Sequence, residues 1–94
     1  MNQEVKNAVA ALVAARRSHQ PVPSLQTPIR SPEAAYAVQD GVAYVLGWFA
    51  GADVPVHWKS GGPARDAELT HAPLPPQGVW DSPADARNWP FTYR

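Results

Sequence analysis

The sequence predicts a small α+β fold, because two segments with helical spacing of apolar residues precede a segment that alternates like a strand. The helical segments are residues 3–18 and a stretch that begins at Ser31, and the strand is residues 54–60. The full expected order is two helices, a strand ending in a glycine turn, a proline-rich loop, a short helical turn and a C-terminal strand. With 94 residues, the chain is long enough for one domain with a thin core.

The first helix is predicted over residues 3–18, where apolar side chains recur every three or four positions and so share one face. This stripe consists of Val5, Ala8, Val9, Leu12 and Val13. Arg16 and Arg17 suit the negative end of the helix dipole. Pro21 and Pro23 cannot continue a helix, so residues 20–30 are expected to form a linker.

The second helix has a clear start, since Ser31 is a good N-cap and Pro32 fits the first helical position. Its apolar stripe consists of Ala35, Val38, Val42, Val45, Leu46 and Phe49. Gly51 is expected to end this helix in the left-handed conformation. Gly41 and Gly47 then lie inside it and weaken it by about 1 kcal/mol each relative to alanine.

The second half is richer in turns than in regular elements. A turn at Gly61-Gly62-Pro63 follows the strand, and residues 64–79 are expected to be irregular because they are polar and then proline-rich. Ser82 begins a pattern resembling a capping box, which predicts a helical turn to about Asn88. Alternating rings in residues 89–94 predict a last strand that needs a neighbour on its edge.

Composition excludes several classes of function. Eight basic and eight acidic residues give zero formal charge, which argues against binding to nucleic acid or to an anionic membrane surface. The chain has no cysteine, so it holds neither disulfides nor thiolate metal ligands, which suits a cytoplasmic protein. The N-terminal sequence does not read as a signal peptide, and no stretch is apolar enough to span a bilayer.

The four tryptophans are unusual for this length and all lie in the second half of the chain, at positions 48, 58, 80 and 89. Such large rings need to be buried against something. We therefore expect the chain to be an incomplete portion of a larger fold, lying against a missing C-terminal portion or a second chain.

Lys59 is the first candidate site residue, because a lysine at the point where a strand meets a glycine turn stands at an exposed edge. His57 shares its face of the strand, so the two basic side chains can meet a carboxylate together. An equally good interpretation is that they form only the polar face of a half-exposed strand.

Other candidate groups follow the strand. Gly61 and Gly62 with Arg65 can bind an anion through backbone amides and a guanidinium group. Asp81 lies beside apolar residues that would raise its pKa, which suits a general acid or base, although it also suits a cap for the next turn. The three histidines have no metal-binding spacing, and Ser60 lacks a recognisable His-Asp pair.

Four segments in this order resemble the start of a 2-keto-4-pentenoate hydratase, in the fumarylacetoacetate hydrolase family. They are Ala14-Ala15-Arg16-Arg17, Pro21-Val22-Pro23, Glu33-Ala34-Ala35-Tyr36-Ala37-Val38-Gln39-Asp40 and Trp58-Lys59-Ser60-Gly61-Gly62. The run from Ala35 to Asp40 is the most specific part. The resemblance covers roughly residues 8–85 and only the N-terminal portion of such an enzyme.

This resemblance implies an enzyme that hydrates or cleaves small 2-oxo acids from aromatic catabolism, with a divalent Mg or Mn that chelates the substrate. Lys59 matches the family lysine, which would bind the substrate's carboxylate or oxo group or help move a proton; Asp81 matches an acidic residue less securely. The family's Glu-x-Glu metal ligands would follow Arg94, so the 94-residue chain is expected to be inactive alone. A homo-oligomer is also expected. The family usually has Ser or Thr after its Lys-x-Gly, where this chain has Gly62-Pro63.

Two hypotheses therefore stand. In the first, residues 1–94 are a single N-terminal segment of a hydratase-like enzyme whose metal-binding part lies elsewhere. In the second, the chain is a non-catalytic interaction or assembly module that uses its tryptophan-rich end as an interface.

Overall fold

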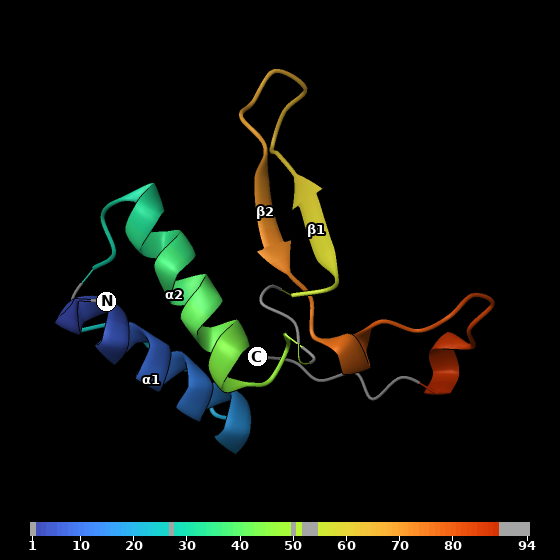
Figure 1. Ribbon diagram of the computed structural model, residues 1–94, viewed down its shortest axis with the longest axis horizontal. Helices are drawn as coiled ribbons and strands as arrows, with labels where there is room; N and C mark the ends of the chain where they lie inside the picture. The colour runs from blue at the N-terminus through green and yellow to red at the C-terminus, as the bar shows by residue number, and fades with distance from the viewer. Residues whose placement is uncertain (1, 27, 50, 52–54, 89–94) are drawn as a thin grey trace.

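The computed structural model describes residues 2–26, 28–49, 51 and 55–88, and these residues form an α+β fold, as the sequence predicts (Figure 1). The helices are α1 (Gln3–Ser18) and α2 (Pro32–Val45), and the strands are β1 (Trp58–Gly61) and β2 (Thr70–Pro73). Two 3₁₀ turns follow, η1 (Pro76–Gly78) and η2 (Ala86–Asn88).

Helix α1 has the bounds that its apolar stripe predicts, and both of its ends are capped. The side chain of Asn2 accepts a hydrogen bond from the backbone N–H of Val5 at 2.8 Å, which satisfies one of the free donors of the first turn. His19 adopts the left-handed conformation with φ of 58° and donates its backbone N–H to the carbonyl of Ala15.

Helix α2 begins as predicted but is shorter than expected. The hydroxyl of Ser31 accepts a hydrogen bond from the backbone N–H of Ala34 at 3.1 Å. The helix ends at Val45, because Gly47 already has a φ of 77° and the chain turns there. Gly47 therefore lies beyond α2 rather than inside it, and the left-handed Gly51 closes a later part of the turn.

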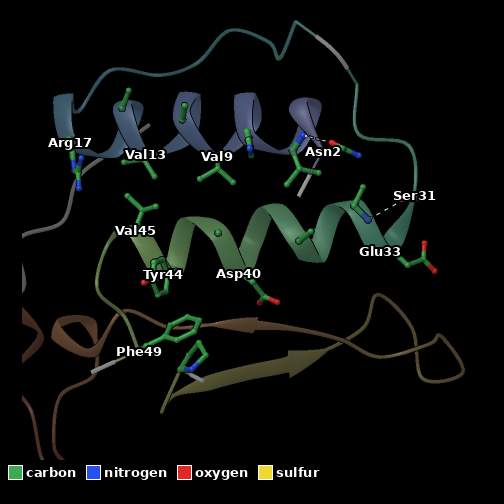
Figure 2. Close-up of a pocket in the computed structure, with 18 of the residues that line it drawn as sticks. Asn2, Val9, Val13, Arg17, Ser31, Glu33, Asp40, Tyr44, Val45 and Phe49 are labelled. Carbon is green, nitrogen blue, oxygen red and sulfur yellow. Dashed lines mark hydrogen bonds between the residues drawn. The ribbon is translucent and has the colours of Figure 1, made fainter. Parts of the chain in front are cut away.

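The two helices lie side by side and run in the same direction, so the chain between them returns along their length (Figures 1 and 2). Their facing stripes form the core, which consists of Val5, Ala8, Val9, Val13, Val38 and Val42. Leu12 and Leu46 pack against this core, as their positions in the predicted stripes require. Ala35 and Val45, which were expected in the stripe of α2, are exposed instead.

The strands form an antiparallel hairpin in which Trp58 lies opposite Pro73 and Gly61 opposite Thr70. Strand β1 begins later than the predicted segment 54–60. Strand β2 corrects the expectation that residues 64–79 are irregular. Sequence reasoning missed β2 because it is only four residues long and is stabilised by cross-strand pairing with β1, which local composition does not report.

The segment after the hairpin contains the expected turn near Asn88, but with a different cap. The carboxylate of Asp85 accepts the backbone N–H of Arg87 at 3.0 Å, so Asp85 rather than Ser82 caps η2. The expected strand at residues 89–94 lies outside the described residues.

The hairpin projects from the helix pair (Figure 1), and the Cα radius of gyration is 14.9 Å. A compact chain of this length would have a radius of about 12 Å. The described part of the chain is therefore more open than a closed domain, in keeping with its thin core. Among these residues, no helix has the length and apolar character needed to cross a membrane.

Candidate functional site

The two faces of the hairpin have different surroundings, and this difference places Lys59. Side chains alternate along a strand, and the register sets Ser60 opposite His71 and Lys59 opposite Ala72. Trp58, Ser60 and His71 therefore share the face that meets α2. Lys59 belongs to the other face, with Gly61 and Thr70.

His71 joins the hairpin to α2 through its ring and its backbone. Its imidazole stacks on the ring of Tyr36 with centroids 4.6 Å apart, and the ring of Trp58 meets it edge-on at 5.3 Å. The side-chain amide of Gln39 donates a hydrogen bond to the carbonyl of His71 at 3.0 Å. These contacts fix the orientation of the hairpin and hence the direction in which Lys59 points.

Lys59 itself is exposed on β1. A Cβ added at Gly61 would lie 3.9 Å from the Lys59 amine, so the lysine side chain extends along the strand over a residue without a side chain. Its cross-strand neighbours on this face, Ala72 and Thr70, are also small. Among the described residues, no carboxylate lies within ion-pair distance of the amine. The amine is thus held at an open surface where an anionic ligand can approach it.

The other predicted residues of the strand and turn have mainly structural contacts. His57 is half-buried, and its carbonyl accepts the backbone N–H of Leu74 at 2.9 Å, which extends the hairpin pairing. Gly62 closes the loop, because a Cβ there would lie 3.4 Å from the carbonyl oxygen of Glu68. Gly61 is the last residue of β1.

Arg65 and Asp81 are both exposed, and they occupy different parts of the molecule. Arg65 lies in the loop at the tip of the hairpin. Asp81 follows η1 in a segment that runs away from the two strands (Figure 1). The structure thus places Lys59 and Gly61 together but leaves Asp81 at a separate position.

The metal implied by the family resemblance does not fit the residues that the structure describes. Across residues 2–26, 28–49, 51 and 55–88, no three His, Asp or Glu side chains gather closely enough to hold a metal ion. No chemical step through Mg or Mn is therefore assigned to this part of the chain.

The clear electrostatic perturbation concerns η2 rather than the hairpin. The side chain of Arg87 donates hydrogen bonds to Asp85, the shortest of them 2.7 Å long, and its backbone N–H adds another. These bonds lower the pKa of Asp85 and raise the pKa of Arg87. Because both groups are at the surface, the pair shapes a turn and does not form a reactive centre.

A second candidate site is an apolar groove of about 1290 Å³ along one side of the helix pair, here called the α1–α2 groove (Figure 2). Small and branched side chains line it, among them Val9, Ala10, Val13, Ala37 and Gly41. Charged side chains stand along its edges, with Lys6 and Arg17 on α1 and Glu33 and Asp40 on α2. Pro55 and Trp58, at the base of the hairpin, bound it on the third side.

Sequence reasoning missed two parts of these sites. His71 falls in the segment that was expected to be irregular, and the partners of its ring come from α2 and β1, far away in the sequence. Sequence reasoning also read each helix as having one apolar face, whereas Tyr44 and Val45 add exposed apolar surface beside the core.

Comparison with known proteins adds no relationship, since no family model, curated protein or solved structure matches this chain.

Proposed function

We propose that this chain is the N-terminal part of a hydratase-like enzyme for small 2-oxo acids of the 2-keto-4-pentenoate type, acting in the cytoplasm in aromatic catabolism. The proposal rests on the resemblance around Trp58-Lys59-Ser60-Gly61-Gly62. One observation supports it: Lys59 is exposed on the face of the hairpin that points away from α2.

In this proposal, Lys59 binds the carboxylate or oxo group of the substrate, and the contacts of His71 hold the hairpin that carries it. A single exposed ion pair contributes at most about 1 kcal/mol, so binding by this chain alone should be weak. The divalent metal would supply the Lewis acid for the developing enolate. In the proposal, residues outside the described part of the chain hold that metal.

A titration of the isotope-labelled chain with a 2-oxo acid such as 2-oxopent-4-enoate tests the role of Lys59 by NMR. We expect chemical-shift changes that cluster at Lys59 and Gly61 and that disappear in Lys59→Met. Lys6→Met is the matched control, since it removes an amine from α1 and should leave these changes intact. Unchanged shifts in Lys59→Met would remove the basis of the proposal.

A hydratase assay of the purified chain with Mg or Mn provides the second test. We expect no robust turnover, because the described residues do not form a metal site. Robust turnover would count against the view that this chain is one part of the catalytic unit.

The α1–α2 groove favours a second candidate function, a non-catalytic interaction or assembly module. The coding sequence beyond codon 94 separates the two functions. A following strand with a Glu-x-Glu pattern supports the enzyme, whereas a stop codon favours the module.

A further inference from the structure

The α1–α2 groove leaves large apolar side chains in contact with water. Tyr44, on its α2 side, is 72% exposed, and Val45 beside it is 45% exposed. Exposed apolar patches rimmed by polar residues are typical of protein interfaces. The groove is open along its length, and small residues such as Ala10, Ala37 and Gly41 are among those that line it, which allows another backbone to come close.

The charges at the edges of the groove have opposite signs on its two sides. The α1 edge carries Lys6 and Arg17, and the α2 edge carries Glu33 and Asp40. A surface with one basic edge and one acidic edge is complementary to itself when a second copy is turned so that the edges exchange places.

The direction of the helices decides which two-fold arrangement fulfils this condition. Because α1 and α2 run the same way, a two-fold axis parallel to them places the α1 of one copy opposite the α2 of its partner (Figure 2). The basic edge then faces the acidic edge twice. A two-fold axis across the helices instead places α1 opposite α1 and brings like charges together.

We propose that the α1–α2 groove binds the same groove of a second copy of this chain, forming a dimer of four helices that all run in the same direction. The Tyr44 and Val45 side chains on α2 of each copy then face α1 of the other, where the small side chains of Ala10 and Ala14 leave room for them. This surface does not depend on Lys59, so the proposal goes beyond the enzymatic function and does not rest on it.

The size of the surface predicts a weak dimer. A helix of 16 residues is about 24 Å long and two adjacent helices are about 20 Å wide, which gives about 480 Å² per copy. The total of about 960 Å² lies just below the range of stable, specific interfaces. We therefore expect a weak, concentration-dependent dimer, with monomer predominating on dilution.

Analytical ultracentrifugation of charge-reversed variants tests the proposal. The native chain should sediment as a dimer at high micromolar concentration. Lys6→Glu with Arg17→Glu makes both edges acidic, and Glu33→Lys with Asp40→Lys makes both edges basic, so each variant alone should be monomeric. An equimolar mixture of the two should form a heterodimer, because every edge then faces an opposite charge.

Asp66→Lys with Glu68→Lys is the matched control for Glu33→Lys with Asp40→Lys. It replaces two acidic residues by lysine in the hairpin loop, away from the groove. It should dimerise like the native chain, and far-UV circular dichroism should show native helix content in all variants. A monomeric native chain, charge variants that still dimerise, or a mixture that stays monomeric would each overturn the proposal. The oligomeric state measured by ultracentrifugation does not depend on substrate binding by Lys59. Either proposal can therefore fail without the other.

Discussion

Replacing Trp48 with alanine should remove much of the stability of this chain. Trp48 is 6% exposed, directly after α2, and the guanidinium of Arg16 lies 4.9 Å from the centroid of its ring. Truncation of a buried tryptophan costs about 3–5 kcal/mol. For a chain of 94 residues with a thin core, the total free energy of unfolding is expected to be about 5 kcal/mol, at about 0.05 kcal/mol per residue.

Urea unfolding followed by far-UV circular dichroism measures this loss, and thermal melting gives a second value. A loss of about 3 kcal/mol should lower the melting temperature by about 12–24 °C. Trp80→Ala is the control, because this ring is 41% exposed and its removal should cost less than half as much. Equal losses for the two variants would refute the assignment of Trp48 to the interior.

Three further predictions concern local contacts. Asn2→Ala removes the cap of α1 and should lower the free energy of unfolding by about 1 kcal/mol in a urea titration. His71→Ala removes the ring that joins the hairpin to α2 and should speed amide hydrogen exchange in the hairpin, with α1 unaffected. Asp85 should titrate by NMR below its ordinary pKa of 3.8, and Arg87→Ala should raise that pKa part of the way back, because the backbone N–H of residue 87 still donates to the carboxylate. Since the folded pKa is lowered, this bond stabilises η2 above about pH 4 and is lost as the pH falls through the folded value. Unchanged unfolding, exchange or titration would contradict the respective contact.

The helical half of the fold was predictable because its signals are local. The stripe of α1 and the caps at Asn2 and Ser31 depend on residues within four positions of each other. The end of α2 was misplaced because two glycines suited a left-handed stop, and the nearer one, Gly47, has the positive φ at the turn. Position alone does not rank two such glycines.

The candidate site was predictable only in part. The presence of Lys59 on a strand follows from the sequence, but it lies inside β1 and not at the turn, since Gly61 is still paired. The direction of Lys59 depends on the pairing of Ser60 with His71 and on the stack of that ring on Tyr36. The grouping of Lys59 with Asp81 came from the family resemblance, and nothing in the local sequence reports that the segment after η1 runs elsewhere.

The shared direction of α1 and α2 limits how short the connection between them can be. The chain must return over the length of a 16-residue helix, about 24 Å. Extended, proline-rich chain covers about 3.1 Å per residue, so about eight residues are needed. The 13 residues between Ser18 and Pro32 thus exceed this minimum by about five. Deleting more than about five of them would prevent α2 from running in the same direction as α1.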